Sequence, residues 1–231
     1  MKKLDKIRKA CFKANQDLIK KKLVIQNFGN VSVRHENSIL IKPSGVNLST
    51  LDYKSMVPVD IVDKKYKGSL KPSSDTPTHI ELYKKYKTIQ SVVHTHSPYA
   101  TSWAQAGSPI PCFGTTHADF WKSKIPITRK LKKKEIETDY EKNTGLVITE
   151  TLTKLKATPL KCPGILVNSH GLFTWGESPH DAIKNAEAVE IIAKMAFNSL
   201  IINPDIKPIN KYLHNKHYYR KHGENKYYGQ K

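Results

Sequence analysis

Two histidines separated by a single residue carry the clearest chemical signal in the chain. His94 and His96 follow the apolar pair Val92-Val93, in a run that is typical of a buried β-strand. Because side chains alternate across a strand, both imidazoles leave the same face and lie close enough to bind one metal ion. The alternative is that they are ordinary polar residues at a strand end, so a metal site requires a third ligand from elsewhere in the chain.

A candidate for that ligand follows a second apolar run. Residues 165–167 are Ile-Leu-Val, a buried type of strand that leads to His170 and Gly171. Residues 172–176 then return as the hairpin partner of this strand. We therefore take His170 as the third candidate ligand.

Two polar segments could bind an anion or take part in a reaction. Residues 71–78 have the composition of a helix start, with Pro77 in the first turn. Free backbone N–H groups and two hydroxyls at such a start make an anion site, although an ordinary capped loop fits these residues equally well. Residues 114–119 contain His117 and Asp119, and both a reactive loop and a surface turn are consistent with them.

Strands and helices must position these residues. Apolar residues at spacings of three and four predict a helix over residues 4–18, which ends in a run of lysines. Short strands at residues 23–25, 31–33 and 39–41, joined by tight turns, indicate antiparallel pairing. Further helices are expected from Ser97-Pro98 to about Gly107, over residues 144–156, and from Ser178 to Pro204.

Length and composition favour one cytosolic domain. The 231 residues show no Pro/Gly/Ser-rich linker and no fixed repeat, and no run is long and apolar enough for a signal peptide or a membrane span. The three cysteines are widely spaced and are expected to be reduced. The net charge of +19 suggests an anionic ligand or nucleic acid, but only four of the 39 basic residues are arginine. Dispersed lysines are typical of a solvated surface, so nucleic-acid binding is the minor interpretation.

Several different short segments, distributed along nearly the whole chain, are informative when they are taken together. They are Gly29-Asn30-Val31-Ser32, Lys42-Pro43-Ser44-Gly45-Val46, Lys71-Pro72-Ser73-Ser74-Asp75-Thr76-Pro77-Thr78-His79, His94-Thr95-His96-Ser97, Trp103-Ala104-Gln105-Ala106-Gly107, Gly114-Thr115-Thr116-His117-Ala118-Asp119, Ser169-His170-Gly171, Lys221-His222-Gly223 and Tyr227-Tyr228-Gly229-Gln230. In this order they resemble the L-ribulose-5-phosphate 4-epimerases, a branch of the class II (metal-dependent) sugar-phosphate aldolase family. Each segment alone is weak evidence, whereas the matched order is specific.

The resemblance implies a fold, a metal site and a phosphate site. The fold would be α/β, with three layers (α/β/α) around a central, mainly antiparallel sheet. The metal would be Zn2+, or another divalent cation such as Mn2+ or Co2+, held by Asp75, His94, His96 and His170. The phosphate of a ketopentose substrate would be held by Gly29, Asn30, Ser44, Gly45, Ser73 and Ser74, with added charge from Lys42.

The resemblance also implies the acid/base groups and the assembly. Asp119 and Tyr228 would be the catalytic acid/base residues, and residues of about 205–231 would complete the site of a neighbouring subunit. A homotetramer with sites between subunits would follow. The other residues that the family keeps around the site match Thr115, Glu141 and His217.

The chemistry of the implied substrate favours one route. The hydrogen on C4 of a 2-ketopentose 5-phosphate is not α to the carbonyl, so simple deprotonation has no resonance sink. No Gly-x-Gly-x-x-Gly motif follows a strand to hold a nicotinamide for oxidation and re-reduction. Retro-aldol cleavage of C3–C4, rotation of the aldehyde and re-addition remain, in arabinose or ascorbate breakdown. The alternatives are a class II aldolase of the fuculose-phosphate type, which releases both fragments, and a non-catalytic module like the adducin head.

Overall fold

One sheet of six strands forms the centre of the molecule, for which we use a computed structural model that describes residues 2–26 and 28–229. The strand order is β3-β2-β1-β4-β6-β5, and every neighbouring pair is antiparallel. The strands are β1 (Gly29–His35), β2 (Ser38–Ile41), β3 (Val57–Asp60), β4 (Ser91–Thr95), β5 (Gly164–Val167) and β6 (Gly171–Gly176).

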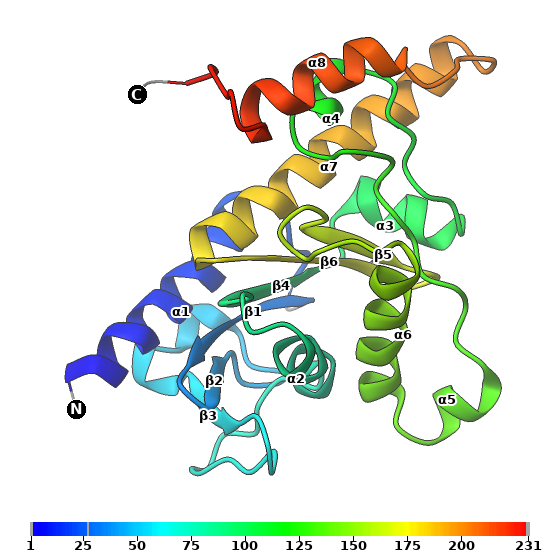
Figure 1. The fold of residues 1–231 in the computed structure, drawn as a ribbon. Helices are drawn as coiled ribbons and strands as arrows, with labels where there is room; N and C mark the ends of the chain where they lie inside the picture. Colours follow the sequence, from blue (N-terminus) through cyan, green and yellow to red (C-terminus); the bar gives the residue numbers. More distant parts are fainter. Residues whose placement is uncertain (1, 27, 230–231) are drawn as a thin grey trace.

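Helices cover both faces of the sheet, as Figure 1 shows. On one face, α1 (Lys2–Lys20) and α3 (Pro98–Gln105) each contact α7 (Pro179–Ile202), and all three contact the strands. On the other face, α2 (Thr76–Lys85) packs with α6 (Tyr140–Lys154). Helices α4 (Thr115–Ala118) and α8 (Lys211–His222) contact each other beyond α7, and α5 (Lys133–Glu137) precedes α6. The expected three-layer α/β/α fold with an antiparallel sheet is confirmed.

Strand β4 lies in the middle of the sheet and sets the positions of its neighbours. Its His94 pairs with Asn30 of β1 on one side and with Phe173 of β6 on the other. Next to them, Thr95 pairs with Gly29 and with Leu172. This register brings segments about 65 residues before and 75 residues after the histidines in the sequence to the same end of the sheet.

Apolar periodicity places the helices against the sheet. The N-cap residue of α7, Ser178, accepts a hydrogen bond from the backbone N–H of Asp181, as a capping residue should. The buried face of α7 includes Ala182, Ala186 and Val189 and packs on β6. None of the helices described is long and apolar enough to cross a membrane.

One expectation about the elements is wrong, and some elements were not expected. Residues 23–25 form no strand, because both edges of β1 are already paired with β2 and β4 and Ile25 makes only an isolated bridge to Phe28. Strand β3 was not expected, since its four residues include a proline, which an edge strand tolerates. Helix α8 was not expected either, because its basic, aromatic sequence has no clear apolar stripe. The last matched segment extends to Gln230, which lies outside the described residues.

Candidate active site

Three imidazoles converge at the end of β4. His94 is buried within the strand, His96 follows it directly, and His170 lies in the turn between β5 and β6. One ligand nitrogen from each ring lies within 4.8 Å of those of the other two, and the Nε2 atoms of His94 and His96 are 3.0 Å apart. The three candidate ligands that were chosen from strand positions therefore meet at one point.

Hydrogen bonds fix which nitrogen of each ring is available. The Nδ1–H of His94 donates to the carbonyl oxygen of Leu172 at 3.0 Å, so its Nε2 carries the lone pair. The ring of His94 also stacks on Phe173, with centroids 4.1 Å apart. Nδ1 of His170 lies 3.2 Å from the hydroxyl of Tyr140. Backbone and aromatic contacts thus hold the rings in place.

The environment keeps the rings of His96 and His170 neutral. Burial lowers the pKa of His96 to about 4, and the nearby His94 adds to this effect. Burial also lowers the pKa of His170 to about 3, with contributions from His94 and His96. Since a metal binds the deprotonated imidazole, all the required lone pairs of these two residues are available at neutral pH.

Asp75 lies near the three histidines but outside their group. Its carboxylate accepts a hydrogen bond of 2.7 Å from Nδ2 of Asn30. Burial alone would raise the pKa of Asp75, but its interactions with His94 and His79 and the Asn30 bond outweigh that effect, and the pKa lies below its ordinary value. A carboxylate that stays charged beside three imidazoles is a suitable fourth ligand, and this role stays a prediction.

The donor set fits a divalent cation. Tetrahedral zinc takes imidazole nitrogens at about 2.0–2.1 Å, which separates two ligand nitrogens by roughly 3.3 Å. The observed 3.0 Å between the Nε2 atoms of His94 and His96 is close to that separation. Three histidines with a nearby carboxylate match the ligand types of catalytic zinc sites.

The predicted phosphate residues line the same end of the sheet. Gly29 has φ +123°, and a Cβ there would lie 2.8 Å from the carbonyl oxygen of His94, so only glycine fits. Asn30 is buried and donates to the hydroxyl of Ser73 at 3.1 Å, which links β1 to the segment before α2. The Oδ1 atom of Asn30 is buried without a hydrogen-bond partner among the described residues. It is a polar atom placed to contact a ligand.

Two loops extend this region. The backbone N–H of Ser73 donates to the carbonyl of Lys42, and that of Ser44 donates to the carbonyl of Lys71, so the two predicted loops run side by side. Lys42 is buried, and burial lowers its pKa while the charge of Asp75 opposes the shift. Ser44, Gly45 and Ser74 are exposed next to it. The structure thus gathers Gly29, Asn30, Lys42, Ser44, Gly45, Ser73 and Ser74 near the histidines.

Asp119 lies in a second cluster, with α8. It follows the short helix α4, so residues 114–119 are neither an extended loop nor a simple turn. Its carboxylate accepts from Arg220 (2.8 Å), Lys221 (3.2 Å) and Nδ1 of His217 (3.1 Å). Burial alone would raise the pKa of Asp119, but hydrogen bonds from Arg220 and Lys221 outweigh it and lower the pKa.

The remaining predicted residues divide between these two groups. The ring of Tyr228 lies beneath the charges of Arg220 and Lys221, at 4.6 and 4.5 Å, and so joins the Asp119 cluster. Thr115 begins α4 in that cluster. Glu141 lies instead in the first turn of α6, where its carbonyl oxygen accepts from the hydroxyl of Thr78. Among the described residues, no hydrogen bond or ion pair joins the two groups.

Two sets of contacts at the site were not predicted from the sequence. Tyr140 contacts His170 across 30 positions, and no spacing rule links them. Arg220 and Lys221 hold Asp119 across about 100 positions, although the segment that contains Lys221 was among the matched ones. The one available signal was the basic and aromatic composition of the tail.

Comparisons with known proteins agree with this arrangement. The chain is 50% identical over 230 residues to the L-ribulose-5-phosphate 4-epimerase UlaF of Salmonella paratyphi C, covering 99% of this chain and 100% of that protein. The corresponding protein of Salmonella typhi is 49% identical over the same length and coverage. These relatives match this chain from end to end.

Solved structures share the fold at low sequence identity. An L-fuculose 1-phosphate aldolase superposes with a TM-score of 0.75 at 19% identity, covering 92% of this chain and 94% of that one. A sugar-phosphate aldolase from Thermotoga maritima gives 0.65 at 18% identity, covering 87% and 97%. The profile of the family described as Class II Aldolase and Adducin N-terminal domain matches residues 9–197. The chain therefore belongs to the class II aldolase and adducin N-terminal domain family.

Proposed function

We propose that this protein is an L-ribulose-5-phosphate 4-epimerase, which interconverts L-ribulose 5-phosphate and D-xylulose 5-phosphate in arabinose or ascorbate catabolism. The observation that carries the proposal is the convergence of three imidazoles, those of His94, His96 and His170, beside the buried polar side chains of Asn30 and Ser73. The 50% identity to an epimerase over the whole chain supports the same substrate.

Each part of the site has a task in retro-aldol cleavage and re-addition. His94, His96, His170 and Asp75 would hold a divalent cation, zinc in our proposal, which when bound stabilises negative charge on substrate oxygens. Asn30, Lys42 and the loop serines bind the phosphate. This contact retains the aldehyde fragment after the C3–C4 bond breaks, so that the fragment can turn over before the bond re-forms.

Asp119 and Tyr228 are the proposed acid/base residues. Each would exchange a proton with the oxygen on C4, one for each face of the aldehyde, so that either C4 epimer can form. His217 and Arg220 orient the Asp119 carboxylate through their hydrogen bonds. Thr115 and Glu141 would contact the substrate from the two clusters.

We also propose that the site is shared between subunits of a cytoplasmic homotetramer. The acid/base cluster on α4 and α8 makes no polar contact with the metal-binding group in the described chain, so a neighbouring chain would supply it. Apolar residues on the C-terminal half of α7 are exposed and suit such an interface, with Met195 at 50%, Ile201 at 65% and Ile202 at 84%.

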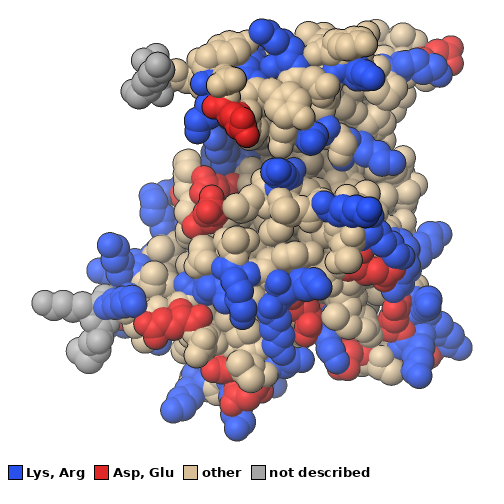
Figure 2. Space-filling view, viewed as in Figure 1, with Lys and Arg blue, Asp and Glu red and all other residues tan. Residues whose placement is uncertain are grey.

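The charge distribution supports a small anionic substrate over nucleic acid. On the face shown in Figure 2, lysines and arginines are scattered over all parts of the surface and are interrupted by acidic residues. A nucleic-acid interface would gather them in one stripe.

The test is conversion of L-ribulose 5-phosphate to D-xylulose 5-phosphate by the Zn2+-loaded protein. We expect His96→Ala and Tyr228→Phe to lower turnover by orders of magnitude while circular dichroism stays unchanged. His180→Ala and Tyr66→Phe are matched controls, because both residues are exposed and neither belongs to the proposed site. Release of free glycolaldehyde phosphate without epimerisation would instead identify an aldolase, an outcome that the fuculose-phosphate aldolase fold makes worth measuring.

A further inference from the structure

Tyr140 touches the candidate metal site without being one of its ligands. It is the first residue of α6, half-buried, and its hydroxyl lies 3.2 Å from Nδ1 of His170. The two rings are 6.1 Å apart and nearly parallel, at 28°. The phenol therefore covers one side of the His170 imidazole.

His170 is not held by regular secondary structure. It belongs to a turn rather than to a strand, and the preceding Ser169 has φ +59°. In the described part of the chain, the Tyr140 hydroxyl is the one hydrogen-bond partner of its ring. If Nδ1–H donates to the tyrosine oxygen, Nε2 keeps its lone pair free for a metal, which is the same tautomer that Leu172 imposes on His94.

The position of Tyr140 is fixed by the packing of α6 on α2. The hydroxyl of Thr78 donates to the carbonyl oxygen of Glu141, the residue after Tyr140, at 2.5 Å. One turn further on, Gly145 lies so close to α2 that an added Cβ would be 2.9 Å from the carbonyl oxygen of Thr78. The first turns of α6 are thus held against α2, whose N-cap residue is Asp75.

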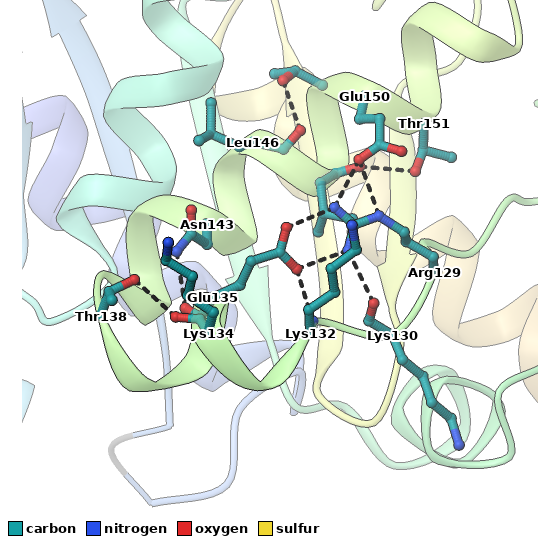
Figure 3. Close-up of polar contacts among 12 residues, drawn as sticks. Arg129, Lys130, Lys132, Lys134, Glu135, Thr138, Asn143, Leu146, Glu150 and Thr151 are labelled. Carbon is teal, nitrogen blue, oxygen red and sulfur yellow. Dashed lines mark hydrogen bonds and ion pairs between the residues drawn. The ribbon is translucent and has the colours of Figure 1, made fainter.

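A charged clamp, visible in Figure 3, links α5 to α6. Arg129 donates to both oxygens of Glu135 at 2.8 Å and through Nε to Glu150 at 3.0 Å. The carbonyl of Glu135 in turn accepts from Nδ2 of Asn143, which lies three residues after Tyr140. The clamp is made of Arg129, Glu135 and Glu150, and the Asn143 contact lies about one turn after Tyr140.

We propose that Tyr140 is a positioning residue that orients His170 toward the metal and selects its metal-binding tautomer. The inference rests on the proposed metal-dependent function and adds a residue to it. The hydroxyl is the part that matters, because the ring alone would cover His170 but could not accept its Nδ1 proton.

The test measures metal binding directly. We compare the wild type with Tyr140→Phe, which keeps the ring and removes the hydroxyl, by titrating metal-free protein with Co2+ against a competing chelator. We expect Co2+ affinity to fall about 10- to 100-fold, as for other partners of metal-bound histidines, with a shifted visible absorption band of the bound Co2+. The Tm of the metal-free variant should stay near that of the wild type.

Two further variants separate the possible failures. Tyr66→Phe, at an exposed tyrosine distant in sequence from the site, should bind Co2+ like the wild type, and His170→Ala should bind it far more weakly. Wild-type affinity and spectrum in Tyr140→Phe would overturn this inference and leave the proposed function standing. A wild type that binds no Co2+ would overturn both.

Discussion

Gly29 shows how closely the backbone approaches at the site. An added Cβ would lie 2.6 Å from the Val24 side chain and 2.8 Å from the carbonyl oxygen of His94, at φ +123°. We expect Gly29→Ala to lower the free energy of unfolding by about 2–4 kcal/mol, because left-handed strain and overpacking add. It should also weaken Zn2+ binding, since β1 is pushed away from His94. Urea denaturation and metal titration measure the two effects.

Gly68 offers a control for the strain alone. It has φ +114°, and nothing lies within 4 Å of a Cβ added there. Gly68→Ala should therefore cost about 1–2 kcal/mol and leave Zn2+ affinity unchanged. Equal losses of stability and metal affinity in both variants would contradict the close approach at Gly29.

His79 makes the metal-free protein sensitive to acid. It is fully buried, its Nδ1 is 2.7 Å from the hydroxyl of Ser32, and burial lowers its pKa to about 3. Between this value and the unfolded value of about 6.5 the unfolded chain binds the extra proton. Stability contributed by neutral His79 is therefore complete above about pH 6.5 and is lost as the pH falls below it.

The free energy of unfolding of wild type and of His79→Asn should therefore depend differently on pH. Between pH 7 and pH 5, in chelator, wild type should lose about 2 kcal/mol more of its free energy of unfolding than His79→Asn does. Urea denaturation at each pH measures the difference. The comparison cancels the other titrating groups, and an identical pH dependence in both proteins would show that His79 titrates normally.

At the scale of single residues, the sequence predicts what depends on local spacing. His94 and His96 follow from alternation along one strand, and His170 from its place after another. Tyr140 does not follow from any spacing, because its contact with His170 depends on how α6 packs on α2. Hydrogen bonds between distant segments are set by tertiary structure.

Between elements, the contacts of the Arg129 clamp should stabilise the packing of α5 against α6. Arg129→Met should lower the Tm by a few degrees, because two carboxylates lose a shared bidentate partner. That contact also holds the pKa of Glu135 at about 2, so the carboxylate is charged throughout the neutral range. The loss of Tm should shrink in 1 M NaCl, since these side chains are partly exposed to solvent and salt screens them.

Lys133→Met is the matched control, as Lys133 pairs only loosely with Glu137 and is almost fully exposed. Its Tm should equal that of the wild type. If Arg129→Met matched it too, the clamp would contribute nothing measurable to stability.

Elements with a strong apolar period were predictable and the others were not. The periodicity of α1 and α7 and the apolar runs of β4 and β5 gave their positions directly. Residues 23–25 have the same apolar character as a strand but no free strand edge to pair with. Helix α8 has weak amphipathicity, and its place is set by the ion pairs of Arg220 and Lys221 with Asp119. Propensity alone does not decide either case.

At the scale of the whole molecule, the candidate site consists of two parts on separate elements. The proposed metal ligands and phosphate loops lie at the end of β4, whereas Asp119 and Tyr228 lie with α4 and α8. Our sequence interpretation assigned only the tail to a neighbouring subunit. Because Asp119 is tied to α8 within its own chain, the neighbour would contribute both acid/base residues together.

Mixing two inactive variants tests this arrangement. His96→Ala removes a proposed metal ligand and Asp119→Asn a proposed acid/base group, so each variant alone should be nearly inactive. If sites form between subunits, unfolding and refolding the variants together in equal amounts creates some sites with both parts intact. Random assembly makes these about a quarter of all sites, because each of the two parts is intact with a chance of one half.

The control mixes His96→Ala with His170→Ala, which lie in the same part of the site. No intact metal-binding part can then arise, and activity should stay at the level of the single variants. A site contained within one chain would give no recovery in either mixture. Recovery in the first mixture alone would therefore mean that one subunit binds the metal and the phosphate, while its neighbour exchanges the proton with the oxygen on C4.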